Sequence, residues 1–390
     1  MRSETISSGA ISPGTTGSEQ PLVLLAAGGT GGHIFPAEAL AEELMRRGYS
    51  LALVTDRRGM GYGGALGRVT VYPIRAGGLA GRGMAGVVRS GMKLAWGTVE
   101  AFRLLRRLRP AVVVGFGGYA SVPTMVAAVV TRTPTVIHEQ NAVLGRTNRI
   151  LASRVSRIAT SFPRVEHLPV KAAPAKATIS CTGMPIRPGG LAMSAAPYEK
   201  IREGGPIHLL VLGGSQGARV LSEVVPAALC RLPETLRGRL HVSQQCRPED
   251  LDAVTQGYRN TGITTDLQSF FHDVPERLAK SHLVIARAGA STVAELTAVG
   301  RPAILVPYPH ATDDHQTANA HAIAETGAAW TMPQEGFTPE TLSARLQSLL
   351  EMPTMLNKAA DCALKAGRPD ATLCLADMVL SLCQAAREVA

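Results

Sequence analysis

Short apolar runs alternate with amphipathic segments along the whole chain. In the first half, runs typical of buried parallel strands occupy residues 22–26, 51–55, 69–73, 111–115 and 135–138. Segments with helical spacing, such as 36–47 and 92–108, lie between them. The second half repeats the alternation, with runs at 207–212, 241–244, 283–286 and 303–306. This pattern predicts an α/β protein with two doubly wound parallel sheets.

The length of 390 residues suits two domains. A stretch rich in Pro and Gly marks the linker between them. The last segment has apolar positions with helical spacing, but periodicity does not assign it to either domain. The predicted organisation is a flexible extension at 1–20, a Rossmann-like domain at 21–185, a linker at 186–205, a second Rossmann-like domain at 206–368 and a C-terminal helix at 369–390.

Targeting and redox patterns are absent from the sequence. The Ser-, Gly- and Thr-rich start has no basic segment followed by an apolar core, so it does not read as a signal peptide. The longest apolar stretch, near 122–130, is far shorter than the roughly 20 residues that span a bilayer. The 6 cysteines are scattered without a CxxC pair, which indicates free thiols in a reducing cytoplasm and argues against a zinc site.

The net charge of +10 is unevenly distributed. Residues 1–200 hold 24 Lys and Arg against 10 Asp and Glu, whereas residues 201–390 hold 16 against 20. A basic half attracts polyanions: nucleic acid, an anionic membrane surface or a phosphorylated substrate. Nucleic acid is the least favoured of these, because aromatic residues make up only 4% and no stacking platform is evident.

Each half opens with a glycine-rich turn between a strand and a helix. The first reads GGTGGH and ends at His33; the second reads GGSQGA from Gly213. Such turns let the backbone approach a ligand and aim helix N–H groups at negative charge. The first turn is not the dinucleotide GxGxxG pattern, and Asp56 is weak support for a ribose clamp, so an NAD-type site is disfavoured. His33 is either a general base at the helix start or a histidine bonded to a neighbouring carbonyl.

Further polar residues follow other strands of both predicted sheets. GFGGYASVP begins at Gly115, and HEQN begins at His138; of these, Glu139 and Asn141 are better ligand candidates than His138. In the second half, ARAGASTVAEL reads as strand, turn and helix, and places Glu295 where a carboxylate can accept both ribose hydroxyls. The Asp313–Asp314 pair beside a histidine is interpreted as a loop and helix start, not as a metal site.

Together these motifs resemble the MurG family. The resemblance rests on GGTGGHIFPAEALAEEL, GFGGYASVP, HEQN, TGMPIR, GGSQGA, ARAGASTVAEL and DDHQTANA, from about Leu22 through DDHQTANA. It implies the GT-B fold, two Rossmann-like domains facing across a cleft. It also implies inverting transfer of GlcNAc from UDP-GlcNAc to the 4-hydroxyl of MurNAc in undecaprenyl-diphosphate-MurNAc-pentapeptide, converting lipid I to lipid II in peptidoglycan synthesis. No cofactor and no metal at the catalytic centre are implied.

The resemblance also implies roles for individual residues. His33 would be the base, and the glycines at 31–32 and 117–118 would cradle the acceptor diphosphate. Asn141 would approach the donor sugar with the first turn, Arg187 and Ser215 would meet the donor phosphates, and Gln316 would hold GlcNAc. Phe271 and the 290–295 turn would frame uracil and ribose. The complete set of expected site residues is His33, Thr30, Gly31, Gly32, Asn141, Arg187, Ser215, Phe271, Ala290, Ser291, Thr292, Val293, Ala294, Glu295 and Gln316.

Other expectations concern the membrane and partners. The resemblance implies a peripheral protein on the cytoplasmic face of the inner membrane, with lipid I as substrate and the cell-wall and division machinery as partners. Leu79, Met84 and Trp96, flanked by Arg82, Arg89 and Lys93, are candidates for docking on an anionic leaflet or for ordinary packing.

The chain departs from some family members in two places, which leaves the contacts near the donor phosphates less defined. Met184 stands where asparagine is frequent, and 243–246 replace a histidine-glutamine segment. Two alternative functions remain: another GT-B enzyme such as a UDP-GlcNAc 2-epimerase, and a non-catalytic nucleotide-sugar-binding membrane scaffold. A Rossmann oxidoreductase is the least favoured.

Overall fold

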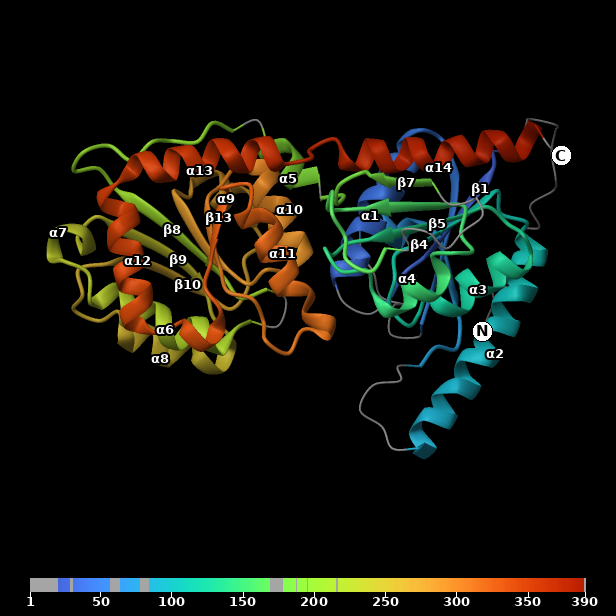
Figure 1. The fold of residues 1–390 in the computed structure, drawn as a ribbon, viewed down its shortest axis with the longest axis horizontal. Coiled ribbons are helices and arrows are strands. Elements are labelled where there is room, and N and C mark those ends of the chain that lie inside the picture. Colours follow the sequence, from blue (N-terminus) through green and yellow to red (C-terminus); the bar gives the residue numbers. More distant parts are fainter. Residues whose placement is uncertain are drawn as a thin grey trace, which may run out of the picture.

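Two domains lie side by side in the computed structural model, the N-terminal one at the right of Figure 1 and the C-terminal one at the left. Each contains one sheet of parallel strands with helices packed on it. The structure describes residues 20–28, 31–56, 64–77, 84–168, 178–186, 188–194, 196–214 and 217–388.

The first sheet has seven parallel strands in the order β3-β2-β1-β4-β5-β6-β7. Strand order reverses between β1 and β4, and in doubly wound sheets the crevice at this switch point is where ligands bind. The strands are β1 (Leu22–Ala26), β2 (Ser50–Thr55), β3 (Thr70–Pro73), β4 (Val112–Gly115), β5 (Thr135–Glu139), β6 (Arg157–Thr160) and β7 (Thr178–Cys181).

The second sheet repeats this topology with six parallel strands in the order β10-β9-β8-β11-β12-β13. Its switch point lies between β8 and β11. The strands are β8 (Ile207–Leu212), β9 (Leu240–Gln245), β10 (Thr264–Gln268), β11 (Leu283–Ala286), β12 (Ala303–Leu305) and β13 (Ala329–Thr331).

Helices connect successive strands on both sheets. Those of the first half are α1 (Gly31–Arg46), α2 (Met84–Leu108), α3 (Val122–Val130), α4 (Arg146–Leu151) and α5 (Pro188–Met193). Those of the second half are α6 (Arg219–Cys230), α7 (Glu234–Arg237), α8 (Leu251–Gly257), α9 (Val274–Lys280), α10 (Ala290–Val299), α11 (His315–Ala324), α12 (Pro339–Glu351), α13 (Pro353–Ala366) and α14 (Ala371–Glu388).

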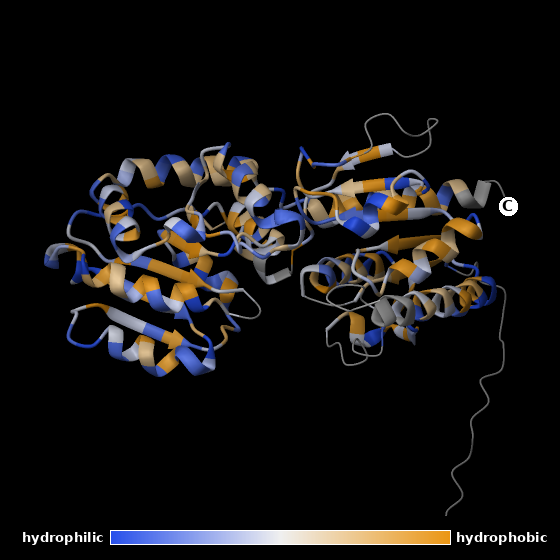
Figure 2. Ribbon diagram, turned by 60° about the horizontal axis from the view of Figure 1, so that its bottom comes forward, coloured by the Kyte–Doolittle hydropathy of each residue, from blue (hydrophilic) through white to orange (hydrophobic). Residues whose placement is uncertain are grey.

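Apolar side chains on both faces of each sheet form the cores. In the first domain, one cluster joins β1 and β4 to α1, and another joins the opposite face to α2 and α3. The second domain has the same two-sided arrangement. Figure 2 shows the apolar strands, in orange, lying between helices whose outer faces carry more polar residues. Burial on both faces explains why the strands read as continuous apolar runs.

The predicted fold class is confirmed, and nine strands lie where the apolar runs predicted them, with ends shifted by one residue at most. The sequence reading omitted four strands: β6, β7, β10 and β13. Three of these lie at sheet edges, where exposure on one side permits polar residues and weakens the apolar signal. Helix α2 begins at Met84, eight residues before the predicted 92–108 segment.

The C-terminal helix returns to the first domain. Leu375, Ala376 and Val379 of α14 are fully buried in the cluster that contains α1. Leu373, which also fits the apolar spacing, is 44% exposed. Figure 1 shows α14 in red, leaving the left domain and lying across the right one. The chain therefore crosses between the domains twice, after β7 and again after α13.

Candidate functional site

The glycine turns lie at the switch points of the two sheets. Gly28 follows β1, and a Cβ atom there would come within 2.5 Å of the Ala120 Cβ, so only glycine fits. Gly117 and Gly118 follow β4 with φ of +84° and +73°, which L side chains rarely adopt. In the second domain, Gly213 follows β8, and a Cβ atom there would come within 2.8 Å of the Gly217 Cα. Both turns bring bare backbone to the carboxyl edge of a sheet.

His33 lies in the first turn of α1, against the Gly117–Gly118 turn. Cβ atoms on those glycines would come within 3.4 Å and 3.3 Å of the imidazole, so the glycines make room for the ring. The His33 side chain is half-buried. Its Nδ1 lies 3.2 Å from Gln140 Oε1.

The surroundings of His33 favour a neutral imidazole. Burial lowers the pKa of His33 below that of an ordinary histidine, although the Glu139 carboxylate and the Gln140 hydrogen bond act in the opposite direction. His315, from α11 of the second domain, lowers this pKa further. A ring that is neutral at neutral pH can accept a proton.

Glu139 and Asn141 have different roles, although sequence analysis treated both as ligand candidates. Glu139 is 2% exposed, and its carboxylate accepts hydrogen bonds from Gly145 N at 2.9 Å, Asn148 Nδ2 at 2.7 Å and Asn141 N at 3.1 Å. These bonds hold the loop after β5 in place around the buried carboxylate. Asn141 is half-buried at the edge of that loop. His138, the weaker ligand candidate, is fully buried.

The helix that carries Glu295 begins at the carboxyl edge of the second sheet. Helix α10 starts three residues after β11, and Gly289 is its N-cap in an extended conformation. Ser291, Thr292, Ala294 and Glu295 are half-buried, whereas Ala290 and Val293 are buried. The first turn of α10 thus presents backbone N–H groups and the positive end of the helix dipole.

Arg287, which sequence analysis did not single out, fixes the loop opposite α10. Its Nη1 donates to Val306 O at 3.1 Å and Pro307 O at 3.0 Å, and its Nη2 donates to Gln334 Oε1 at 2.6 Å. Burial lowers the pKa of this guanidinium. Gln316 anchors the same loop, since its Oε1 accepts from Tyr308 N at 3.0 Å.

Phe271, which the resemblance implies would help to frame the uracil, has a buried side chain. Its ring is 2% exposed within the apolar cluster below β8 and β11, and the Arg277 guanidinium carbon lies 3.9 Å from the ring centroid. Its neighbour Phe270 is 55% exposed. The side chain of Phe271 therefore belongs to the core.

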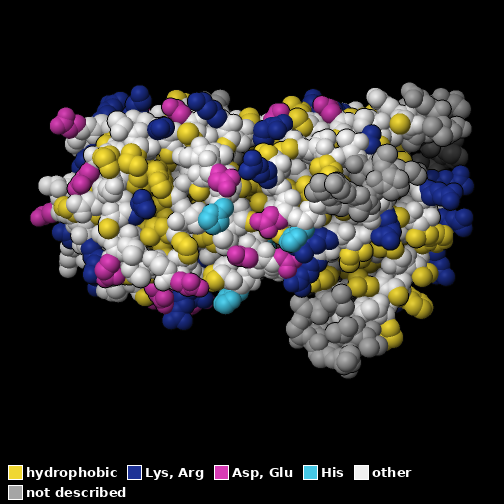
Figure 3. Space-filling model, in the orientation of Figure 1, with side chains coloured by type: hydrophobic (Ala, Val, Ile, Leu, Met, Phe, Trp, Pro, Cys, Tyr) yellow, Lys and Arg dark blue, Asp and Glu magenta, His cyan; other side chains and the backbone are white. Residues whose placement is uncertain are grey.

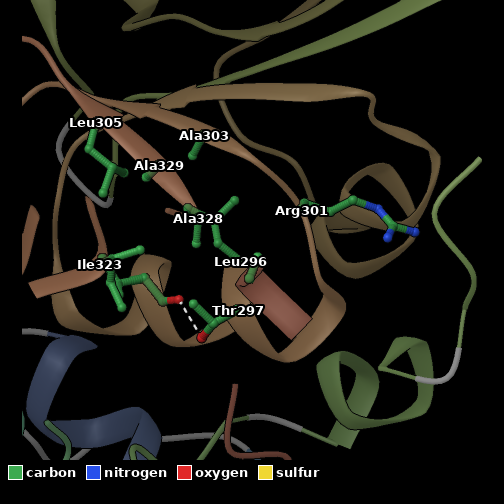
Figure 4. Close-up of a pocket in the computed structure, with 10 residues that line it drawn as sticks. Leu296, Thr297, Arg301, Ala303, Leu305, Ile323, Ala328 and Ala329 are labelled. Carbon is green, nitrogen blue, oxygen red and sulfur yellow. Dashed lines mark hydrogen bonds between the residues drawn. The ribbon is translucent and has the colours of Figure 1, made fainter. Parts of the chain in front are cut away.

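Helix α10 is seated on the sheet by close packing. Figure 4 shows the space between α10, α11, β12 and β13, lined mainly by apolar side chains such as Leu296, Leu305 and Ile323. No volume there admits a water molecule, so it is a packed core and not a ligand site. Thr297 Oγ1 returns its hydrogen bond to Val293 O at 2.9 Å within the helix.

The structure describes most of the expected site residues but not all. Gly31 and Gly32 are half-buried at the start of α1. Thr30, Arg187 and Ser215 lie outside the described residues, so the expectation that they meet the substrates stays a prediction.

Asn319 joins the two domains and was missed by sequence analysis. It is fully buried in α11, and its Oδ1 accepts from Ala142 N at 2.8 Å. Its Nδ2 donates to Asn141 Oδ1 at 3.1 Å and to Ala288 O at 3.0 Å. One amide thus connects the loop after β5 with the loop before α10. In the sequence Asn319 appears only as a polar residue within DDHQTANA, and periodicity does not show that this position is buried.

A cross-domain ion pair adjoins this contact. Arg146 Nη2 and Arg149 Nη2 of α4 lie 2.7 Å and 3.1 Å from the Asp313 carboxylate. The hydrogen bond from Arg146 lowers the pKa of Asp313. Asp313 and Asp314 both have positive φ, +53° and +50°, just before α11. The acidic pair is therefore a loop and helix start, as interpreted, and Asp313 is engaged by arginines of the other domain.

Two Rossmann-like domains whose loops at the carboxyl edges of the sheets contact each other are typical of the GT-B class of glycosyltransferases. The match to family models is specific: residues 23–160 match the glycosyltransferase family 28 N-terminal domain and residues 208–373 match the glycosyltransferase family 28 C-terminal domain. The chain belongs to the MurG family within glycosyltransferase family 28.

Individual relatives agree with this assignment. The chain is 60% identical to the "UDP-N-acetylglucosamine--N-acetylmuramyl-(pentapeptide) pyrophosphoryl-undecaprenol N-acetylglucosamine transferase" of Paramagnetospirillum magneticum, over 94% of this chain and 98% of the relative. It is 57% identical to the protein of the same name from Rhodospirillum rubrum, over 92% and 91%. The crystal structure of MurG from Acinetobacter baumannii superposes with a TM-score of 0.74 at 29% identity, covering 93% of this chain and 99% of that one.

We predict that Asn319→Ala accelerates amide hydrogen exchange in the loop after β5 of the first domain. The loss of the amide leaves Ala142 N–H without its acceptor, which costs about 1–3 kcal/mol. Amide hydrogen exchange at residues 141–145 should accelerate about 10–100-fold, since each tenfold corresponds to about 1.4 kcal/mol. The matched control is Thr317→Ala on the same helix, because Thr317 Oγ1 bonds only within its own domain, to Asp314 Oδ1. Unchanged exchange at 141–145 in Asn319→Ala would contradict the role of Asn319.

Proposed function

We propose that this chain transfers GlcNAc from UDP-GlcNAc to the 4-hydroxyl of lipid I, producing lipid II, with inversion at the anomeric carbon. The observation that carries the mechanism is the position of His33, whose imidazole lies against the Gly117–Gly118 turn and whose pKa is lowered by burial. Family membership supplies the substrate class, and the relatives' names specify the same acceptor.

The chemistry is a single displacement. The acceptor 4-hydroxyl oxygen forms a bond to the anomeric carbon of GlcNAc while the bond from that carbon to the UDP oxygen breaks. The hydroxyl proton passes to the His33 Nε2, and the electron pair leaves with UDP. Holding the acceptor, the base and the donor in one cleft supplies much of the rate.

The donor side is assigned to the second domain. The first turn of α10, residues 290–295, would receive the nucleoside, with the Glu295 carboxylate on the ribose hydroxyls. Gln316 would hold the GlcNAc hydroxyls, and Arg187 with Ser215 would stabilise the leaving diphosphate. Backbone N–H groups at a helix N-terminus stabilise an anion without a charged side chain.

The acceptor side is assigned to the first domain. Positive-φ glycines at 117–118, together with Gly31 and Gly32, would cradle the lipid diphosphate through backbone N–H groups. Asn141 would approach the donor sugar from this side. A UDP-GlcNAc 2-epimerase would not need these acceptor turns, and a non-catalytic scaffold would not need a neutral base.

Substitutions at His33 and Glu295 should separate chemistry from donor binding. His33→Ala should lower kcat about 10²–10⁴-fold and leave the Kd of UDP-GlcNAc nearly unchanged, because the imidazole acts on the acceptor proton. Glu295→Ala should weaken UDP-GlcNAc binding. Steady-state transfer assays give kcat, and isothermal titration gives Kd. An equal loss of donor affinity in both variants would remove His33 from the role of base.

A membrane-docking surface is assigned to α2. Met92, Trp96 and Val99 are 62%, 57% and 46% exposed, and their spacing places them on one face of the helix. Lys93 and Arg103 are exposed beside them. Figure 3 shows apolar and basic side chains together along α2 at the lower right. Of the other candidates for this surface, Leu79 and Arg82 lie outside the described residues, as do the side chains of Met84 and Arg89.

This surface supports a peripheral location on the cytoplasmic face of the inner membrane, where lipid I is the substrate and the cell-wall and division machinery are candidate partners. Within the residues that the structure describes, none of the helices is both long enough and apolar enough to span a bilayer. An apolar stripe with basic neighbours binds anionic lipid through both burial and charge.

Vesicle binding tests the α2 surface. The double variant Met92→Ser/Trp96→Ser should lower the partition constant on phosphatidylglycerol-containing vesicles about tenfold or more, because two apolar side chains no longer enter the interface. The control is Met352→Ser/Met355→Ser on the second domain, where the side chains are 48% and 37% exposed. An equal loss in the control, or binding indifferent to anionic lipid, would refute this surface.

A further inference from the structure

A chain of three hydrogen bonds connects His33 to the backbone of Gly183, just after β7. His33 Nδ1 lies 3.2 Å from Gln140 Oε1, and Gln140 Nε2 lies 3.1 Å from His138 Nδ1. His138 Nε2 lies 3.1 Å from Gly183 O. Gln140 and His138 are 2% and 0% exposed, so water does not compete for these bonds. The chemistry of the site does not otherwise use either residue.

The acceptor at Gly183 O determines which atoms donate and which accept along this series of hydrogen bonds. A carbonyl oxygen only accepts, so His138 Nε2 carries the hydrogen. Burial lowers the pKa of His138 to about 4, which leaves the ring neutral and its Nδ1 free of hydrogen. Gln140 must therefore turn its amide nitrogen, and not its oxygen, toward His138.

Other contacts of the Gln140 amide require the same orientation. Gln140 Nε2 lies 2.9 Å from Phe116 O and 3.0 Å from His138 O. Both are acceptors, and a reversed amide would face them with its oxygen. Gln140 Oε1 is thus the atom that faces His33, and His33 Nδ1 is the donor in that bond.

We propose that Gln140 and His138 are positioning residues that keep the His33 proton on Nδ1 and the lone pair on Nε2. Loss of the Gln140 acceptor leaves the Phe116 backbone as the remaining hydrogen-bond partner of the ring and shifts the tautomer toward Nε2. A ring protonated on Nε2 cannot take a proton from a hydroxyl group at that atom. The inference rests on the proposed function only in identifying Nε2 as the basic atom; the tautomer itself is a property of the unliganded protein.

The remaining titratable groups around His33 act on its charge and not on its tautomer. Glu139, at the end of β5, favours the charged ring, and His315 of α11 disfavours it. His138, two bonds away in the chain, is neutral. The Phe116 backbone also accepts a hydrogen bond from the ring, which raises the pKa of His33.

The direct test is the tautomer of the two histidines in the wild-type protein. Two-bond ¹H–¹⁵N spectra of ¹⁵N-histidine-labelled protein, recorded near pH 8, distinguish protonated from unprotonated ring nitrogens. We expect His33 to be protonated on Nδ1 and His138 on Nε2. The signals are assigned by their loss in His33→Ala and His138→Asn. Protonation of His33 on Nε2 in the wild type would overturn the inference, whatever the transferase activity.

Two variants at Gln140 connect the tautomer to turnover. Gln140→Met keeps the volume and removes the acceptor; His33 should become partly protonated on Nε2, and kcat should fall about 10–100-fold with donor Kd unchanged. Gln140→Glu restores an acceptor for Nδ1. The other carboxyl oxygen of this variant faces Phe116 O and His138 O, which are acceptors, so we expect the carboxyl group to be protonated and to donate there. The variant should keep the wild-type tautomer and recover part of kcat.

Thr135→Val provides the matched control on β5, the strand that carries His138 and precedes Gln140. Thr135 is 1% exposed, and its Oγ1 accepts from Ser156 N at 3.1 Å, so the variant also loses one buried hydrogen bond in β5. It should lower stability without moving the tautomer or the pH profile. A fall in kcat for Gln140→Met with an unchanged His33 tautomer would overturn the positioning role. A wild-type tautomer as expected, without GlcNAc transfer, would instead contradict the proposed function.

Discussion

The site depends on the contact between the carboxyl edges of the two sheets, to which a buried amide contributes next to the Arg146–Asp313 ion pair. Asn319 bonds Ala142 and Asn141 of the first domain and Ala288 of the second. A buried amide must satisfy each of its hydrogen-bonding groups, so this contact forms only when the two loops have the correct register. The placement of His33 opposite α10 follows from it. Helix α14 also links the two domains, because it follows α13 of the second domain and packs in the core of the first.

The two domains use the same topology for different tasks. Each sheet offers a glycine turn at its switch point, where the backbone approaches a ligand and a helix begins. In the first domain that helix also carries His33, a half-buried histidine whose pKa is lowered by burial. In the second domain the helix after the neighbouring strand β11, α10, carries the carboxylate of Glu295. The two domains share a topology and differ in these side chains. His33 suits the first domain to deprotonating an acceptor, and Glu295 suits the second to binding a nucleotide.

Sequence patterns predicted what local constraints determine. Buried parallel strands are apolar on both faces, and the Gly28 and Gly117–Gly118 turns admit only glycine, so both features appear directly in the sequence. Tertiary contacts were less accessible. The domain that α14 joins, the burial of Phe271 and the cross-domain role of Asn319 depend on residues distant in the chain. The edge strands β7 and β10 were missed because exposure relaxes their composition.

The most direct test of this account is transfer of radiolabelled GlcNAc from UDP-GlcNAc to a short-chain lipid I analogue by the purified protein, with and without EDTA. The account predicts labelled disaccharide-lipid and stoichiometric UDP, with the rate preserved in the chelator. Conversion of UDP-GlcNAc to an epimer without labelled lipid would contradict it and favour the epimerase alternative. Binding of UDP-GlcNAc without any turnover would contradict it in favour of a scaffold.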